Sequence, residues 1–478
     1  MLTATFGAYF VLVFIIAWIA YRNTHNLSDY ILGGRRLGRW TTAISAGASD
    51  MSGWLLLGLP GYAYLNGFEA SWIALGLLLG TTINWITVAP RLRIYSESCG
   101  NALTLSEFFE YRLNDKSHLL RYVSAFFILL FFLFYTASGL VAGGKLFETV
   151  FGLPYYWAVC IGALTILAYT SAGGFLAVSW TDLFQGLLML LALALVSLTA
   201  LHRIGGWHAM VAGMDQVNPA LSNALLHTGG QALSGISLVS LLGWGLGYFG
   251  QPHILARFMA IRSPALIRDA RRIAVSWSAL SLGAALLIGF CAITCLPHGL
   301  TGADSEKVFI NMVQLFFHPV TAGICLAAIL AAIMSTADSQ LLVASSAVTE
   351  DIYKTLFKKS ASDRELVYFG RAAVIVISLI ALSLALDPER KVLDLVSYAW
   401  AGFGAAFGPV LILALYWDKL SISGTIGGIA MGGGTVIIWS QLEGGIYDMY
   451  ELVPGFLFSL AAAWLTSLFS LYYKKAHH

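Results

Sequence analysis

The chain has 478 residues, of which 58% are hydrophobic and only 11% are charged, with a formal net charge of +2. A soluble domain carries roughly 25% charged residues, so this composition argues against a soluble protein. The balanced charge gives no reason to expect nucleic-acid binding. We therefore expect an all-α polytopic membrane protein, whose partner is the lipid bilayer and which has no soluble domain of any size.

Apolar runs of roughly 20 residues, the length that crosses a bilayer, recur from one end of the chain to the other. Within hydrocarbon every backbone polar group needs a partner in its own segment, so these runs predict helices. We predict thirteen transmembrane helices, at residues 4–21, 38–63, 69–89, 122–143, 154–171, 174–201, 233–256, 273–296, 318–346, 370–386, 393–416, 421–440 and 452–473.

Basic residues predict the orientation, because Lys and Arg are retained on the cytoplasmic side of a membrane. If the first connection is cytoplasmic and the sides then alternate, most of the 27 Lys and Arg residues fall in cytoplasmic loops. The pattern places the amino terminus outside and the carboxyl terminus in the cytoplasm. It also leaves no Lys or Arg in the middle of a span.

Glycine and proline interrupt the second and seventh predicted spans, at SAGASDMSGW (residues 45–54) and GWGLGYFGQPH (residues 243–253). Both residue types destabilise a helix interior, and membranes tolerate them where the freed backbone groups find partners or line a cavity. Two broken helices five spans apart indicate a transporter whose binding site lies between two inverted repeats, spans 2–6 and 7–11. Close helix packing is the alternative explanation for the glycines.

Three carboxylates, Asp50, Asp182 and Asp338, lie well inside predicted spans. With no basic partner at comparable depth, each needs a cation, a proton or a water-filled cavity. Ser335, Asp338 and Ser339 share one helical face, which the sixth span with Asp182 is expected to face. Their oxygens suit sodium. A hydroxyl bonded back to the preceding turn, or a protonated aspartate, is the alternative.

The aromatic residues and the missing charges limit the substrate. Trp54 follows the first break, Tyr135 lies within the fourth span, and Trp244 and Tyr248 lie in the second break. They predict an apolar pocket with few polar groups, which disfavours a strongly anionic solute. The N–H groups of a broken helix suit an amino-acid carboxylate instead. The residues alone therefore predict a cation-coupled carrier of a small, zwitterionic, fairly apolar solute.

Other classes of membrane protein fit less well. The histidines show no metal-binding or catalytic-triad spacing, so we do not expect an enzyme. No repeated charged ring or filter-like motif suggests a channel. A sensor is disfavoured because the printed sequence carries no appended signalling domain.

Seven long motifs resemble the bacterial sodium/proline symporters of the sodium:solute symporter family, and they are spread over nearly the whole chain. The motifs are SDYILGGRRLG, SAGASDMSGWLLLGLPG, NALTLSEFF, GGFLAVSWTD, LLGWGLGYFGQPHILARFMA, LAAIMSTADSQLLVASSAVTEDIYK and VSYAWAGFGAAFGPV. The resemblance implies sodium-coupled import of L-proline by alternating access across the bacterial inner membrane, by a protein that functions as a monomer. The same fold carrying another small amino acid or carboxylate, or coupled to protons, is the alternative.

The resemblance also implies an organisation. The fold would be of LeuT type, with the five-plus-five inverted repeat and thirteen spans. Residues 1–478 would form one transmembrane transporter domain. Its segments would be the first span with its cytoplasmic loop (1–37), the first repeat (38–202), the second repeat (232–417) and the last two spans (418–478).

Functional residues follow from the same resemblance. The sodium site would consist of main-chain oxygens of Ala48, Met51 and Ala332 and the hydroxyls of Ser335 and Thr336, with Asp50 nearby to organise the broken helix. The substrate and gate positions would be Ser52, Gly53, Trp54, Tyr135, Trp244, Tyr248 and Pro252. Arg35 matches a loop position tied to coupling. Asp338 departs from the uncharged residue expected there, and with Asp182 and Ser339 it resembles a second sodium site of some relatives.

Overall fold

The computed structural model describes residues 2–21, 27–170, 174–296, 299–358 and 360–476. Residues 22–26 of the predicted first loop and residue 171 at the end of the predicted fifth span lie outside this description. Within the described ranges the chain forms helices, turns and two isolated β-bridges, and it contains no strand. The all-α class predicted from the composition is confirmed.

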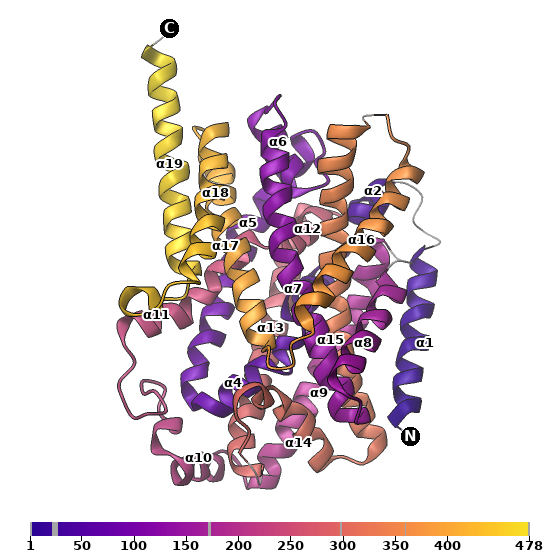
Figure 1. Cartoon of the computed structure of the whole chain (residues 1–478), viewed down its shortest axis with the longest axis vertical. Coiled ribbons are helices and arrows are strands. Elements are labelled where there is room, and N and C mark those ends of the chain that lie inside the picture. The colour runs from indigo at the N-terminus through magenta and orange to yellow at the C-terminus, as the bar shows by residue number, and fades with distance from the viewer. Residues whose placement is uncertain (1, 22–26, 171–173, 297–298, 359, 477–478) are drawn as a thin grey trace.

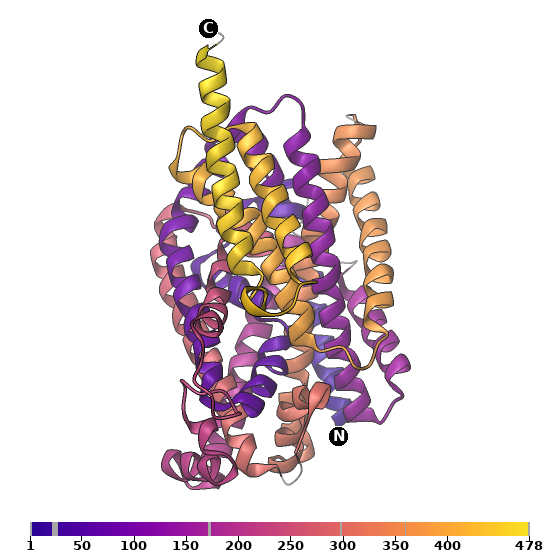
Figure 2. The same cartoon turned by 60° about the vertical axis from the view of Figure 1, so that its left-hand side comes forward.

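The helices run mostly side by side along the long axis of the molecule, and α1 begins at the end opposite to the one where α19 finishes (Figures 1 and 2). The first half of the chain contains α1 (Leu2–Tyr21), α2 (Leu27–Leu32), α3 (Arg39–Met51), α4 (Gly58–Asn66), α5 (Ser71–Ser98), α6 (Leu105–Leu113), α7 (Leu119–Phe151), α8 (Tyr155–Thr170), α9 (Phe175–Ile204) and α10 (Trp207–Val217). The second half contains α11 (Gly235–Gly243), α12 (Pro252–Ala260), α13 (Ile267–Cys295), α14 (Val308–Phe316), α15 (Pro319–Ser346), α16 (Asp363–Ala385), α17 (Val392–Tyr416), α18 (Ile422–Trp439) and α19 (Leu452–Ala476).

Among the described residues, nine helices are long and apolar enough to cross a membrane, and three shorter ones are apolar. The three shorter stretches are Ala4–Ile19, Tyr155–Thr165 and Gly235–Gly250. Together these stretches overlap all of the predicted spans, because the longest, Gly53–Ser98, includes the end of the second and the whole of the third. The polytopic architecture is confirmed, while the count of thirteen stays a prediction.

Both predicted helix breaks are present. The first lies between α3 and α4, where a single 3-10 turn, η2 (Gly53–Leu55), connects the two halves. The second lies between α11 and α12, where a longer 3-10 segment, η5 (Trp244–Gly250), replaces α-helix. Helix α15 runs unbroken to Ser346 and continues as a π-helix, η8 (Ala347–Phe357).

Glycines of η5 also serve close packing, the alternative explanation for them. A Cβ on Gly247 would lie 1.9 Å from the indole nitrogen of Trp400, and a Cβ on Gly250 would lie 2.1 Å from the main-chain oxygen of Phe403. Only glycine lets η5 lie this close to α17. These glycines therefore weaken the α-helix at η5 and also allow η5 to pack closely against α17.

We expect Gly247→Ala to lower the unfolding temperature of the purified protein in detergent. The added methyl group overlaps Trp400, and overpacking of this kind costs about 1–3 kcal/mol. Gly283→Ala is the matched control, because a Cβ at Gly283 in α13 meets no atom within 4 Å. That control should leave the unfolding temperature unchanged or raise it slightly, since Ala is the better helix former. Equal unfolding temperatures for Gly247→Ala and the control would contradict the packing argument.

Candidate substrate and cation site

The carboxyl end of α3 supplies carbonyl oxygens at the first break. The last four C=O groups of a helix have no intrahelical partner. Here Ala48 O accepts hydrogen bonds from the hydroxyls of Ser335 at 2.9 Å and Thr336 at 3.3 Å, both on α15. The Ser335 hydroxyl also lies 3.1 Å from Ala332 O. Four of the five predicted sodium ligands thus meet at one point, and Met51, the fifth, is the buried last residue of α3.

Ser52 makes the break in the backbone. Its φ of 40° and ψ of −167° lie outside helical geometry, and a positive φ is uncommon for a residue other than glycine. The Ser52 hydroxyl accepts a hydrogen bond from the N–H of Trp54 at 3.3 Å. Gly53 is closed in, because a Cβ there would lie 2.8 Å from the side chain of Ala142. Strained residues of this kind cluster at ligand sites, which makes this turn a candidate site.

Asp50 joins the two broken helices. Its carboxylate accepts a hydrogen bond at 2.6 Å from the hydroxyl of Tyr248 in η5. Its main-chain oxygen accepts another at 3.0 Å from the hydroxyl of Tyr135 in α7. Asp50 is 3% exposed. The side chain therefore faces the second break, whereas the oxygen that meets Ser335 and Thr336 is the main-chain oxygen of Ala48, two residues earlier in α3.

Side chains that the sequence did not single out satisfy the carbonyls freed in η5. Each donates a hydrogen bond to a main-chain oxygen: Asn84 to Tyr248 at 3.0 Å, Trp400 to Trp244 at 2.8 Å, and Gln251 to Gly247 at 3.1 Å. An unsatisfied carbonyl in hydrocarbon is costly, so these donors make the 3-10 segment possible. The sequence signal for Asn84 and Gln251 was the presence of a polar residue inside an apolar run.

Aromatic rings pack around the two helix breaks. Trp54 lies 6.0 Å from Trp244 between ring centroids, and Tyr450, from the loop before α19, stacks on Trp244 at 5.2 Å. Tyr450 was not predicted, because it lies far from both breaks in sequence. All seven predicted substrate positions are buried: Ser52, Gly53, Trp54, Tyr135, Trp244, Tyr248 and Pro252. This conformation encloses them.

The prediction that no basic side chain lies deep in a span is wrong. Arg257 on α12 is fully buried and donates to the Asp182 carboxylate at 3.1 Å and to the Ser339 hydroxyl at 2.5 Å. The predicted seventh span ended at residue 256, whereas α12 carries the helix on to Ala260 inside the bundle. Asp182 and Ser339 are thus brought together, with buried Asp338 adjacent in α15, around an arginine. Binding of a second sodium ion there stays a prediction.

A second buried cation, Lys145, lies just beyond the predicted fourth span, which ended at residue 143. It lies in α7, which extends to Phe151, and its side chain is 2% exposed. Its amino group pairs with Glu306 at 2.5 Å, and the Glu306 carboxylate also accepts the first N–H groups of α17. The pair belongs to the packing of the helix ends, away from both breaks.

Arg35 ties the first loop to the second broken helix. Its guanidinium donates to Met259 O of α12 at 2.6 Å and to Ala102 O at 2.8 Å. Partial burial lowers the pKa of Arg35 to about 10, so the group is still charged at neutral pH. The predicted coupling residue is thus a bridge from the loop to α12.

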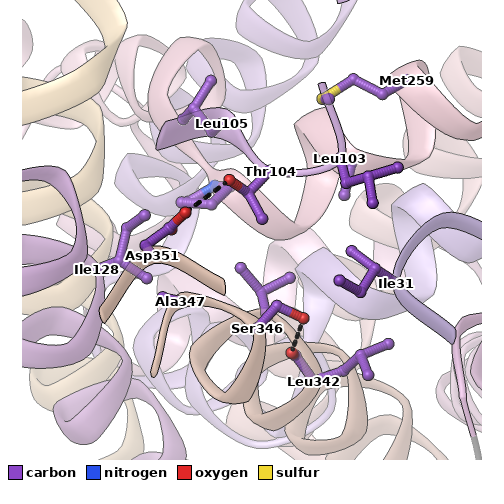
Figure 3. A pocket seen from close by; sticks show the side chains of 13 residues that line it. Ile31, Leu103, Thr104, Leu105, Ile128, Met259, Leu342, Ser346, Ala347 and Asp351 are labelled. Carbon is purple, nitrogen blue, oxygen red and sulfur yellow. Dashed lines mark hydrogen bonds between the residues drawn. The ribbon is translucent and has the colours of Figure 1, made fainter. Parts of the chain in front are cut away.

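A small pocket lies beside α12, lined mainly by apolar side chains of α2, α7, α12 and α15 and of the residues around the start of α6 (Figure 3). Pro252 lines it, which connects the predicted substrate positions to this pocket. Thr104 and Asp351 stand at one side, where the Thr104 hydroxyl donates to the Asp351 carboxylate at 3.1 Å. This contact joins the amino end of α6 to η8.

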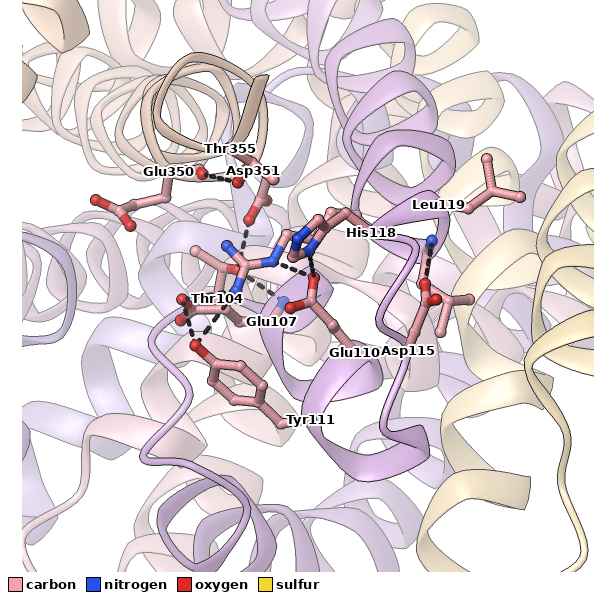
Figure 4. A network of polar contacts seen from close by, with 12 residues as sticks. Thr104, Glu107, Glu110, Tyr111, Asp115, His118, Leu119, Glu350, Asp351 and Thr355 are labelled. Atoms are coloured by element: carbon pink, nitrogen blue, oxygen red, sulfur yellow. Dashed lines mark hydrogen bonds and ion pairs between the residues drawn. The ribbon is translucent and has the colours of Figure 1, made fainter. Parts of the chain in front are cut away.

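A polar network holds α6 in place next to that pocket (Figure 4). Arg121 of α7 donates to Glu110 at 2.5 Å and to Glu107 at 3.2 Å, both on α6. The ring of His118 lies 3.2 Å from the same Glu110. These contacts fix α6 against α7 at the end of the bundle where α19 finishes (Figure 1).

The comparisons decide the family. Residues 30–432 match the model of the sodium:solute symporter family. The chain belongs to this family. It is 50% identical over 459 residues to the sodium/proline symporter of Salmonella typhimurium, covering 95% of this chain and 90% of that protein. It is 48% identical over 456 residues to a high-affinity proline transporter of Bacillus subtilis, covering 95% of each chain.

A solved structure shares the fold of this symporter-family member. A Na+-coupled sialic acid symporter in a substrate-bound outward-open state aligns with a TM-score of 0.80 over 98% of each chain, at 18% identity. At that identity the likeness shows the fold alone. The family consists of transporters, which places the chain among carriers.

We expect Tyr248→Phe to destabilise this family member. The substitution removes the hydrogen bond to the buried Asp50 carboxylate, and hydrogen bonds to charged groups contribute about 1.5–3 kcal/mol. The measurement is the unfolding temperature in detergent. Tyr156→Phe is the control, because Tyr156 is 59% exposed on α8. An unfolding temperature for Tyr248→Phe equal to that of the control would show that the Asp50 contact is dispensable.

Proposed function

We propose that the protein is a sodium-coupled symporter that imports L-proline by alternating access. The observation that carries the proposal is the meeting of Ala48 O at the end of α3 with the hydroxyls of Ser335 and Thr336 on α15. The curated relatives at about half identity over nearly the whole chain, which are named as proline transporters, support the solute.

Sodium suits the carboxyl end of α3 for two physical reasons. The C-terminal end of a helix carries partial negative charge, which favours a cation. Hard cations prefer oxygen ligands, and the groups gathered here are carbonyl and hydroxyl oxygens. A bound sodium ion would take lone pairs that Ala48 O now offers to Ser335 and Thr336. Met51 and Ala332 would contribute the remaining predicted carbonyls.

The residues that follow the first break suit L-proline. The N–H groups after Ser52 form the start of a new helical segment, where a carboxylate is favoured. Trp54 and Trp244 offer an apolar wall for the pyrrolidine ring. No strongly anionic solute is expected, since Arg257 is engaged by Asp182.

The Asp50–Tyr248 hydrogen bond would link ion to solute. Asp50 lies within the last turn of α3, and Tyr248 lies in the 3-10 segment that walls the pocket. Sodium binding that stabilises the first break would therefore also change the stability of the second break. A ligand shifts a conformational equilibrium by its difference in affinity for the two states, and this contact supplies such a difference.

The topology is part of the proposal. We infer thirteen spans with an inverted repeat in spans 2–6 and 7–11, the amino terminus outside and the carboxyl terminus in the cytoplasm of a bacterium. An odd count agrees with the opposite positions of the start of α1 and the end of α19 (Figure 1). The division of the chain into segments 1–37, 38–202, 232–417 and 418–478 stays a prediction. So does its function as a monomer. The pocket beside α12 then lies on the cytoplasmic side.

The test is uptake of radiolabelled L-proline into proteoliposomes under an inward sodium gradient, with potassium replacing sodium as the control. Uptake that needs sodium supports the proposal. Proline uptake driven by a pH gradient without sodium would keep the solute and replace the ion. Failure to take up proline would redirect the search to other small zwitterions and carboxylates.

Replacing Ser335 by Ala is expected to raise the sodium concentration for half-maximal proline uptake by about tenfold or more. The hydroxyl is one of the oxygens gathered at Ala48 O, and losing about 1.4 kcal/mol of binding energy corresponds to tenfold. Ser281→Ala is the control, because Ser281 is equally buried but lies on α13. A sodium requirement unchanged in both variants would place the ion elsewhere.

Asp50→Asn is expected to reduce sodium-dependent proline uptake by at least about tenfold, since the amide loses the charge that strengthens the Tyr248 hydrogen bond. The measurement is the initial rate at saturating sodium, normalised to the amount of reconstituted protein. Asp418→Asn, on an exposed carboxylate, should retain uptake. Wild-type rates for Asp50→Asn would contradict a role for this carboxylate in linking the two breaks.

A further inference from the structure

The strongest polar contact set outside the sodium and proline positions surrounds Arg257. Its guanidinium donates to the hydroxyl of Ser45 on α3 at 3.1 Å, to Asp182 on α9 at 3.1 Å, and to Ser339 on α15 at 2.5 Å. It also donates to His253 O in its own helix at 3.0 Å. Both Arg257 and Asp182 are 0% exposed. One cation therefore holds four helices together inside the bundle.

The same oxygens are those expected of a cation site. Ser45 also donates to the Asp182 carboxylate at 2.6 Å, so one carboxylate and two hydroxyls converge on the guanidinium. Buried Asp338, one residue before Ser339, lies close enough for its charge to act on Arg257. Two carboxylates at this depth require positive charge nearby. In this chain the guanidinium of Arg257 supplies that positive charge.

We propose that Arg257 is a tethered cation that takes the place of a second coupling sodium ion beside Asp182, and so limits the transporter to one sodium ion per solute. The inference rests on the proposed function. It assigns a positioning role to a residue whose hydrogen bonds reach Asp182 and Ser339 of the predicted second sodium site, but no ligand of the first sodium site and no predicted proline position. A guanidinium bound to the chain cannot dissociate during the cycle, so its charge stays when sodium leaves.

Arg257 would also anchor α12 to the helices around it. It lies on the same short helix as Pro252, which is a predicted substrate position and also lines the pocket beside α12. Its bonds to α3, α9 and α15 anchor that helix to the one that carries Ser335 and Thr336. Removing the charge frees the oxygens of Asp182 and Ser339 together, and this is the arrangement that a second sodium ion needs.

The experiment measures the number of sodium ions in two ways, with the full chain in each. The Hill coefficient for sodium is taken from proline uptake in proteoliposomes, and bound radioactive sodium per protein is taken by equilibrium dialysis in detergent. A Hill coefficient reaches at most the number of sites. We expect about one for the unmodified protein and for Arg257→Lys, which keeps the charge, and about two sodium ions bound by Arg257→Gln.

If Arg257→Gln does not fold, because breaking a buried ion pair on one side is strongly destabilising, the sodium count of the unmodified protein still tests the inference. A double variant serves as the control. Asp182→Asn with Arg257→Gln removes both charges and is expected to bind about one sodium ion. Two sodium ions in the unmodified protein would overturn the inference without any variant. So would one ion in a folded Arg257→Gln protein. Absence of sodium-dependent proline uptake in the unmodified protein would instead overturn the proposed function.

Discussion

Backbone groups cannot go unpaired in a bilayer, and both breaks in this protein depend on how that requirement is met. At the end of α3 the carbonyl of Ala48 receives two hydroxyls from α15, and that of Asp50 receives the hydroxyl of Tyr135. In η5 the freed carbonyls accept hydrogen bonds from side chains of α5 and α17 and from Gln251, the residue before α12. The groups that allow the helices to break are therefore donors on neighbouring helices. Binding an ion or a solute at a break means exchanging such partners.

Two of the three deep carboxylates, Asp50 and Asp182, have different environments. Asp50 accepts a hydrogen bond from the neutral hydroxyl of Tyr248, and among the described residues no ion pair compensates its charge. Asp182 is paired with Arg257 and bonded to Ser45. A paired carboxylate holds helices together, whereas an unpaired one responds to a cation that comes and goes. Asp182 therefore holds α9 to α12, whereas Asp50 has the environment that the proposed sodium coupling requires.

Arg257 and Arg35 both anchor α12, from opposite directions. Arg257 binds its middle to the interior of the bundle, and Arg35 binds its last turn to the first loop. Near them, Arg121 fixes α6 against α7, and the Thr104–Asp351 contact joins α6 to the π-helical end of α15. Helix α15 also carries Ser335 and Thr336. The proposed cation position and the pocket beside α12 thus share one continuous helix, which would be a physical route for the proposed coupling.

The amino-acid sequence determined the all-α membrane class and the positions of both breaks, because apolar length and glycine clusters are local properties. Its motifs also led to oxygens of Ala48, Ala332, Ser335 and Thr336 that the structure brings to one point. Only the tertiary structure decided the partners of the charges. The sequence suggested no basic group at depth, yet Arg257 reaches Asp182 because the break before Pro252 redirects α12 into the bundle. Tyr450 and Trp400 likewise meet Trp244 at the second break through packing between distant segments, which periodicity along one helix does not encode.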